Sequence, residues 1–349
     1  MRDDQKVITY KGRSFNSSIS APMTDAEMEK VVEYIYRPAD QREVDREMVS
    51  LAGGGGKLSA ITRNYFLDLM YQTRNGQDAW SIKEACEYKP ILEYFKGKCD
   101  VEKHPMMADI DNLGKRIETA FRLCGIRSAR KVAQFPISMA DRIIGRYCPM
   151  GGNYYDPSCG WGVRMLSALH KGVNYYGTDP NAELVKRLYE CAKRYSILNP
   201  SFFPTVTDMR AVGSESLQSD WIGRMDFSFT SPPYFGLEIY PGSGQSYREG
   251  MGYGEWLDTW MKPTADNILA YLKPKAYCAI NIKDVVLNRI TYPLEKDTVR
   301  IFTEAGFRFV GTDILEVNKR VFGNVSWEEG HDAGVHEDAD ESIFVFQKQ

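Results

Sequence analysis

The segment with the clearest chemical potential is a proline pair flanked by a serine and a tyrosine. It lies in the run FTSPPYF (Phe229–Phe235), at the end of an apolar run that predicts a strand. Prolines fix the backbone and have no N–H, so the nearby carbonyl oxygens remain free to accept hydrogen bonds. The Ser231 hydroxyl and the Pro232 carbonyl could accept both N–H bonds of an exocyclic amine, with the Tyr234 ring stacked on its base. Alone, this run would be explained better as a rigid turn with a packed tyrosine.

A glycine-containing turn precedes it, between a predicted strand (Asn153–Tyr155) and a predicted helix (Gly162–Leu169). It reads DPSCGWG from Asp156 onward. The two glycines let the backbone approach a ligand without a Cβ clash, and a helix N-terminus directs free N–H groups to the same place. The carboxylate of Asp156, at the strand end, could accept from a cationic or hydroxylic group of that ligand.

A second acidic residue ends the next predicted strand, at Asp179 in the run YGTDPN (Tyr176–Asn181). An acidic residue about twenty residues after a glycine loop reaches the ribose hydroxyls of a bound nucleoside in many nucleotide-binding folds. The alternative is that Asp179 caps the helix predicted from Ala182. The two segments together predict a cofactor that contains a nucleoside.

In this order the three segments resemble motifs I, II and IV of the S-adenosylmethionine-dependent amino-methyltransferases of DNA, and the resemblance covers residues 130–349. The Ser-Pro-Pro-Tyr form is typical of enzymes that methylate cytosine N4, whereas adenine-N6 enzymes usually have Asp or Asn first. The runs Phe235–Tyr240 and Asn281–Asp284 are similar to a phage and bacterial subset of the family. The sequence departs from many members at Ser158 and Cys159, where they have Phe and a small residue.

The resemblance implies direct methyl transfer from S-adenosylmethionine to an exocyclic amine of double-stranded DNA. Ser231 and Pro232 would aim the amine lone pair and stabilise the charge that develops on nitrogen. The target base would be flipped out of the duplex and stacked on Tyr234, with Phe235 as a second stacking candidate. The sequence disfavours cytosine-C5 chemistry, because that family uses a cysteine after a proline and no cysteine here follows one.

The resemblance also implies a set of site residues. The run 134–142 resembles motif X, which packs on the cofactor, and Gly213–Glu215 resembles motif III, which approaches its adenine; Asp208 competes with the preferred Glu215. The predicted cofactor-binding residues are Phe135, Pro136, Asp156, Ser158, Gly160, Gly162, Asp179, Pro180, Asn181, Glu215 and Thr230. The predicted catalytic residues are Ser231, Pro232, Pro233 and Tyr234, and the predicted substrate contacts are Phe235, Glu238, Tyr240 and Arg248.

The elements that must position these residues alternate between strand and helix from residue 126 onward. This pattern predicts an α/β fold, a Rossmann-like class I methyltransferase with a mostly parallel seven-stranded sheet. Its last two strands (Phe307–Glu316 and Ser342–Gln347) should form an antiparallel pair at one end. Residues 1–125 read as a mainly helical region, a candidate for target recognition, in which Thr24–Glu27 and Ser81–Glu84 predict capping boxes.

Composition sets outer limits on function. Lys and Arg number 44 against 47 Asp and Glu, a formal charge of −3 that excludes a uniformly basic nucleic-acid binder. No apolar run approaches the roughly 20 residues of a membrane span. The seven cysteines include no CxxC pair, and no histidine has metal-ligand spacing with a cysteine, so we expect neither a disulfide framework nor a metal site. We expect a cytoplasmic protein, in a bacterial or phage-infected cell.

DNA reading is expected from the N-terminal region and from the Gly- and Tyr-rich loop 237–254, in which Arg248 could reach a phosphate. The densest basic group is Arg122, Arg127, Arg130 and Lys131, which a solvated helix end would explain equally well. The acidic run 328–341 would be repelled by DNA and should either point away from it or stay mobile.

Three other functions are compatible with these residues. They are an adenine-N6 DNA methyltransferase, an RNA or protein amide methyltransferase, and a catalytically silent DNA-binding protein on the same fold. The recognition sequence and a cognate nuclease, as in a restriction–modification pair, cannot be predicted from these residues.

Overall fold

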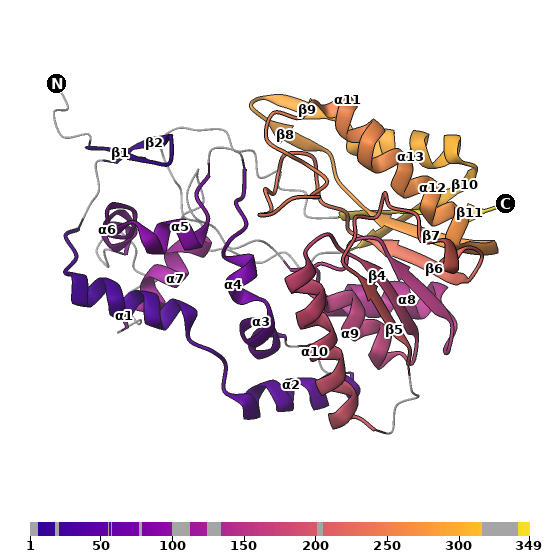
Figure 1. Cartoon of the computed structure of the whole chain (residues 1–349), viewed down its shortest axis with the longest axis horizontal. Coiled ribbons are helices and arrows are strands. Elements are labelled where there is room, and N and C mark those ends of the chain that lie inside the picture. Colours follow the sequence, from indigo (N-terminus) through magenta and orange to yellow (C-terminus); the bar gives the residue numbers. More distant parts are fainter. Residues whose placement is uncertain are drawn as a thin grey trace. The chain divides into compact units, whose positions relative to one another are not determined.

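The chain forms two compact units in the computed structural model (Figure 1). The first comprises Met1–Val44, Leu58–Ala133 and Leu237–Pro241, and the second comprises Asp45–Lys57, Gln134–Gly236 and Gly242–Gln349. The residues that the structure describes are 6–17, 21–54, 56, 58–76, 79–99, 112–123, 134–200, 205–315 and 341–349. The expected boundary near residue 125 lies outside this part of the chain, as do Arg127, Arg130, Lys131 and residues 328–340. The side chain of Arg122 also lies outside it.

The first unit is mainly helical, as the sequence predicts, but it also holds a two-stranded antiparallel hairpin that the sequence pattern did not reveal. Its strands are β1 (Lys6–Tyr10) and β2 (Arg13–Ser17). The helices up to the second unit are α1 (Asp25–Tyr36), α2 (Gln41–Ala52, which continues into the second unit), α3 (Ser59–Tyr65), α4 (Leu67–Met70), α5 (Ile82–Glu87), α6 (Lys89–Lys98) and α7 (Leu113–Leu123). Trp80, Phe95 and Phe121 lie in its buried core.

Both predicted capping boxes are confirmed. Thr24 accepts from the backbone N–H of Glu27, whose carboxylate accepts from the Thr24 backbone, and α1 begins at the next residue. Ser81 and Glu84 make the same reciprocal pair at the start of α5. Each pair satisfies two N–H groups that a helix start leaves unpaired, which is typically worth about 1 kcal/mol.

The second unit is built on a seven-stranded sheet, which confirms the predicted fold class. The strands are β3 (Asn153–Asp156), β4 (Asn174–Thr178), β5 (Thr207–Arg210), β6 (Met225–Thr230), β7 (Leu272–Asn281), β10 (Phe307–Leu315) and β11 (Glu341–Lys348). Their spatial order is β10-β11-β7-β6-β3-β4-β5. The pairs β7-β6, β6-β3, β3-β4 and β4-β5 are parallel, and only β11 runs antiparallel to its neighbours, so β10 and β11 form the expected antiparallel pair.

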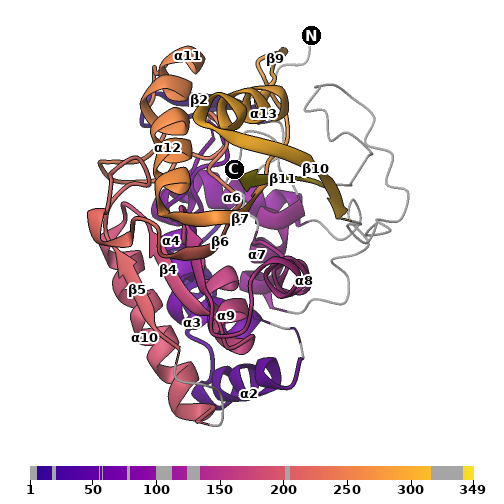
Figure 2. The same cartoon turned by 90° about the vertical axis from the view of Figure 1, so that its right-hand side faces the viewer.

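Helices cover both faces of this sheet. They are α8 (Ile137–Tyr147), α9 (Val163–His170), α10 (Ala182–Leu198), α11 (Tyr253–Trp256), α12 (Lys262–Tyr271) and α13 (Leu294–Ala305), and a π-helical stretch (Leu257–Met261) joins α11 to α12. Figures 1 and 2 show α8, α9 and α10 on one side of the strands and α12 and α13 on the other. A small hairpin of β8 (Val285–Leu287) and β9 (Ile290–Tyr292) follows β7.

The strand order creates a switch point between β3 and β6. From β3 the chain winds outward through β4 to β5, and it then returns to place β6 on the opposite side of β3. In open parallel sheets, ligands bind outside the carboxyl ends of the strands at such a point. The loops after β3 and after β6 meet there, and they are the two that carry the glycine turn and the Ser-Pro-Pro-Tyr motif.

Candidate active site

The loop after β3 has the backbone that its glycines allow. Gly160 and Gly162 have φ of 55° and 75°, in the left-handed region that favours glycine. Gly162 is the N-cap of α9, and the cap position has no side-chain hydrogen bond. The residue at this cap position therefore offers no side-chain acceptor to the first-turn N–H groups of α9, which suits a ligand that brings acceptors.

The carboxylate of Asp156 is satisfied by the protein itself. Arg164 donates to both of its oxygens, at 2.8 Å and 3.2 Å, and Tyr175 donates its hydroxyl at 3.0 Å. The backbone N–H of Ser158 adds a fourth bond at 3.2 Å. Asp156 and Arg164 are 0% and 5% exposed, so this is a buried ion pair. The structure thus differs from the expectation that Asp156 accepts from a ligand: its carboxylate holds the loop, and Arg164 is the residue that sequence reasoning missed.

Cys159 connects the same loop to β4. Its side chain is buried, and its backbone N–H donates to the carbonyl of Thr178 at 3.0 Å. A Cβ at Gly177 would lie 2.5 Å from the Cys159 sulfur, so only glycine fits at that point of β4. Burial raises the pKa of the Cys159 thiol, which keeps it protonated and supports its interpretation as a packing residue.

Asp179 lies where β4 ends and is tied to the glycine loop. It accepts from the backbone N–H of Asn181 at 3.0 Å and from that of Gly160. Burial raises the pKa of Asp179 to about 6, although these two hydrogen bonds act in the opposite direction. The helix cap is Asn181, whose side chain accepts from the N–H of Leu184 at 3.1 Å, so the alternative role for Asp179 is taken by its neighbour. Between the two residues, Pro180 is half-buried.

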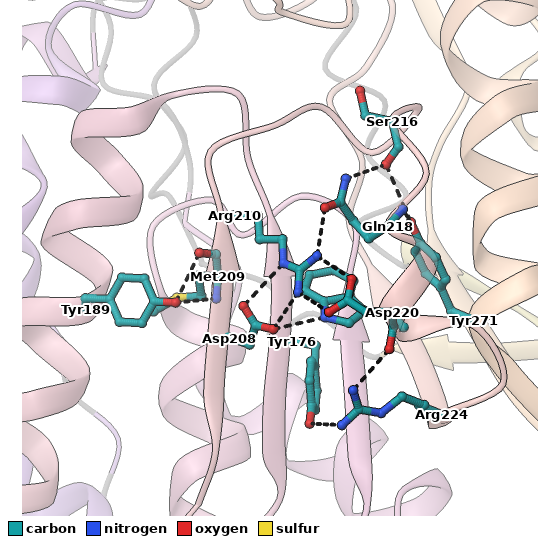
Figure 3. Close-up of polar contacts among 11 residues, drawn as sticks. Tyr176, Tyr189, Asp208, Met209, Arg210, Ser216, Gln218, Asp220, Arg224 and Tyr271 are labelled. Carbon is teal, nitrogen blue, oxygen red and sulfur yellow. Dashed lines mark hydrogen bonds and ion pairs between the residues drawn. The ribbon is translucent and has the colours of Figure 1, made fainter.

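Two carboxylates near the carboxyl end of β5 are candidates for the adenine contact: Asp208, within the strand, and Glu215, after it. Asp208 accepts from Arg210 at 3.0 Å and from the indole N–H of Trp221 at 3.0 Å, within the network drawn in Figure 3. Arg210 also binds Asp220 and stacks 4.2 Å from the Trp221 ring centre. In contrast, Oε2 of Glu215 is buried and has no hydrogen-bond partner among the described residues. This supports Glu215 over Asp208 as the carboxylate available to a ligand.

The Ser-Pro-Pro-Tyr motif begins at the residue after β6. Pro232 is buried, whereas Ser231, Pro233 and Tyr234 are half-buried. Thr230, the last residue of β6, is 2% exposed, and its hydroxyl has no partner in the described part of the chain. A buried polar atom without a partner costs about 1–3 kcal/mol, so Thr230 and Glu215 are suited to partners that arrive with a ligand.

Phe135 contacts β6 and the arginine that pairs with Asp156. Its ring packs edge-on against Phe229 of β6, with centroids 5.5 Å apart, and the Arg164 guanidinium lies 5.8 Å from its centre. Pro136 is exposed at the N-cap of α8. The segment resembling motif X therefore reaches Arg164, the partner of Asp156.

Asn281 is a second residue that the predicted site left out. It ends β7, next to β6, and the pairing of Thr230 with Ile280 brings it level with Ser231. It is 1% exposed, and its side-chain oxygen has no partner among the described residues. The position could have been found from the sequence as the last residue of the strand after the Ser-Pro-Pro-Tyr segment.

The structure places the expected base contact Phe235 in a packed aromatic cluster. Phe235 is 4% exposed, and its ring contacts Tyr247 at 5.2 Å, Tyr253 at 5.2 Å and Tyr292 at 4.8 Å between centroids. A ring enclosed in this way cannot also stack on a base, so the expected stacking role of Phe235 is corrected to one of anchoring the motif.

The other expected substrate contacts have internal partners. Tyr240 donates its hydroxyl to Glu238, whose pKa is raised by burial. Both belong to a segment of the first unit in which Ile239 forms an antiparallel bridge with Arg74. Arg248 is exposed and pairs with Glu255.

The strand order and the loops at the switch point define the class: a Rossmann-like methyltransferase fold. The sequence matches no family model and no curated protein. The chain is similar in structure to a methyltransferase from Methanosarcina mazei that depends on S-adenosylmethionine, with 15% identity over 62% of this chain and 99% of that one and a TM-score of 0.38. It is also similar to magnesium protoporphyrin IX methyltransferase from Synechocystis PCC 6803 with bound S-adenosylmethionine, with 11% identity over 61% of this chain and 79% of that one and a TM-score of 0.37. A third similar structure is a candidate DNA modification methylase from Thermus thermophilus, with 20% identity over 36% of this chain and 46% of that one and a TM-score of 0.26.

The strand order itself, with four parallel pairs and an antiparallel β11, defines this fold. Among the described residues, no helix is long and apolar enough to cross a membrane. In the same part of the chain, no three His, Cys, Asp or Glu side chains form a group that could hold a metal ion.

Proposed function

We propose that this protein is an S-adenosylmethionine-dependent DNA methyltransferase that modifies an exocyclic amine, with cytosine N4 favoured over adenine N6. The observation that carries the proposal is the position of Ser231–Tyr234. The motif begins directly after β6, beside the glycine loop after β3, at the switch point of the sheet. A cofactor held by one loop would present its reactive group to the other.

The donors and acceptors around the switch point fit S-adenosylmethionine. We assign the ribose hydroxyls to Asp179 and the adenine side to Glu215, whose buried oxygen lacks a partner among the described residues. Gly160 and Gly162 let the backbone approach the ligand, and Thr230 lies at the end that faces the motif. When bound, the cofactor supplies a methyl group on a positively charged sulfur.

The residues of the motif would position the acceptor amine. The Ser231 hydroxyl and the Pro232 carbonyl accept its N–H bonds, which favours a tetrahedral nitrogen with its lone pair aimed at the methyl carbon. Pro233 keeps the turn rigid. Tyr234 stacks on the flipped base. A new N–C bond forms, the S–C bond breaks, and one proton leaves the methylated nitrogen for water.

The serine at the first position supports cytosine N4 as the target. Residues 1–125 remain our candidate for target recognition, and a cytoplasmic location and duplex DNA as partner follow from the same proposal. An RNA or protein amide methyltransferase would use similar chemistry, and a catalytically silent protein would keep the fold alone.

Nucleoside mass spectrometry tests the proposal. Unmethylated duplex DNA is incubated with the protein and S-adenosylmethionine, beside the variants Ser231→Ala and Tyr234→Ala. We expect N4-methylcytosine from the wild type and at least a hundredfold less from either variant. Ser219→Ala, at an exposed serine of the same unit, is the matched control and should keep full activity.

Each outcome decides one part of the proposal. N6-methyladenine would keep the mechanism and overturn the choice of base. Cofactor binding without any methylated nucleoside in DNA would overturn the DNA substrate and direct the search to RNA and protein.

A further inference from the structure

The hairpin of β8 and β9 lies at the edge of the sheet where the site loops gather. It begins four residues after Asn281, the carboxyl end of β7. Its turn residues Asn288 and Arg289 have φ of 52° and 67°, as in a two-residue type I′ hairpin. In Figure 1 the hairpin lies beside α11.

The base of the hairpin is fixed to the catalytic motif through aromatic contacts. The ring of Tyr292 in β9 lies 4.8 Å from that of Phe235 and 5.1 Å from that of Tyr253. Phe235 directly follows Tyr234 in the chain, and Val285 at the start of β8 is also buried. The hairpin therefore has a set position relative to the group that would hold the target base.

The outer part of the hairpin carries exposed aliphatic side chains and a single positive charge. Val286 is 51% exposed and Ile290 is 56% exposed. Arg289, at the tip, is the only charged residue between Val285 and Tyr292. Two aliphatic side chains are too few for a stable protein interface, which buries roughly 800 Å² on each partner.

We propose that this hairpin enters a groove of duplex DNA beside the target base, with Arg289 on a phosphate and Ile290 against the bases; Val286, which pairs with Thr291, lies on the opposite face of the ribbon. The inference rests on the proposed DNA methyltransferase function. The major groove, about 12 Å wide, admits a two-stranded ribbon, and aliphatic side chains commonly intrude where stacking is disturbed. Because a flipped base disturbs the stack, the hairpin would stabilise the duplex that the flipped base leaves behind.

The test measures duplex affinity as a function of salt for three variants. Arg289→Gly removes the charge but leaves Asn-Gly, the preferred I′ turn, so the hairpin is kept. We expect severalfold weaker binding and a salt slope smaller by about one. Ile290→Ser should raise KM for duplex DNA with little change in kcat. Ile222→Ser, at an isoleucine of 51% exposure elsewhere in the same unit, should bind as the wild type.

Binding of S-adenosylhomocysteine checks that every variant is folded and separates the two proposals. If the wild type methylates DNA and both hairpin variants match it in affinity, salt slope and KM, the hairpin proposal is overturned while the proposed function stands. If the wild type binds S-adenosylhomocysteine but neither binds nor methylates DNA, the proposed function fails and the hairpin proposal fails with it.

Discussion

Two strand ends of the sheet carry acidic residues in opposite states. Asp156, the last residue of β3, is buried, and both of its oxygens accept hydrogen bonds from the protein. After β5, Glu215 has a buried oxygen with no partner in the described part of the chain. The first carboxylate is used up in holding a loop, and the second is available for a ligand. A carboxylate at the end of a parallel strand is therefore not by itself evidence for ligand binding. The hydrogen bonds that it already accepts from the protein determine whether it is available to a ligand.

The same difference recurs within one region. Asp208 and Glu215 lie seven residues apart in the sequence, yet Asp208 is bound by Arg210 and Trp221. Variants of the satisfied carboxylates or their partners should change stability, and variants of the unsatisfied one should change ligand affinity.

The largest effect is expected from Arg164→Met, which leaves the Asp156 carboxylate buried without its cation. We expect a loss of about 3–5 kcal/mol in the free energy of unfolding, the usual cost of breaking a buried ion pair. Urea denaturation measures it. Arg187→Met, which removes a helix-surface pair with Glu183, is the control and should cost under about 0.5 kcal/mol.

A loss of under about 1 kcal/mol for Arg164→Met would contradict the assigned role of Asp156 as the anchor of the loop. A loss of cofactor affinity at unchanged stability would return Asp156 to the ligand-binding role that the sequence suggested.

The next effect concerns Glu215→Ala and Asp208→Ala. Removing Glu215 should weaken S-adenosylhomocysteine binding about ten- to a hundredfold, since a hydrogen bond to a charged group contributes roughly 1.5–3 kcal/mol, and should not lower stability. Removing Asp208 should lower the free energy of unfolding and leave S-adenosylhomocysteine binding unchanged, because it leaves the buried Trp221 N–H without its acceptor. Calorimetric titration and urea denaturation give both quantities, and equal effects of the two variants would remove the distinction.

The sequence predicts the parts of the site that depend on order along the chain. The seven strands, the antiparallel pair and the place of Ser231 after a strand all follow from local patterns. It does not predict the pairing of Asp156 with Arg164, because that depends on how the first turns of α9 fold back over β3. The burial of Phe235 likewise depends on Tyr292, a distant residue of a hairpin whose three-residue strands are too short to give a clear alternating pattern.

The smallest expected effect is a pH dependence set by Asp179. Burial raises its pKa from 3.8 to about 6, so the ligand-free protein takes up a proton there as the pH falls below 6. A ribose hydroxyl donates better to the carboxylate than to the neutral acid, so the Kd for S-adenosylhomocysteine should rise about tenfold between pH 7 and pH 5. In Asp179→Asn this change of Kd with pH should be absent, and the affinity at pH 7 should be weaker than that of the wild type. Calorimetric titration from pH 5 to pH 7 measures the Kd of both proteins. A wild-type Kd that does not change with pH, or that changes in the same way in the variant, would contradict the ribose assignment.

The same proton has the opposite effect on folding, which separates the two readouts. Because the folded, ligand-free protein holds this proton more tightly than the unfolded chain, Asp179 contributes stability at low pH that is lost as the pH rises from 3.8 through 6. Acid should thus favour the ligand-free fold at this residue while it weakens the complex. A general acid destabilisation would weaken both together, so urea denaturation with and without ligand at pH 5 and pH 7 distinguishes a titrating ligand contact from simple loss of the fold.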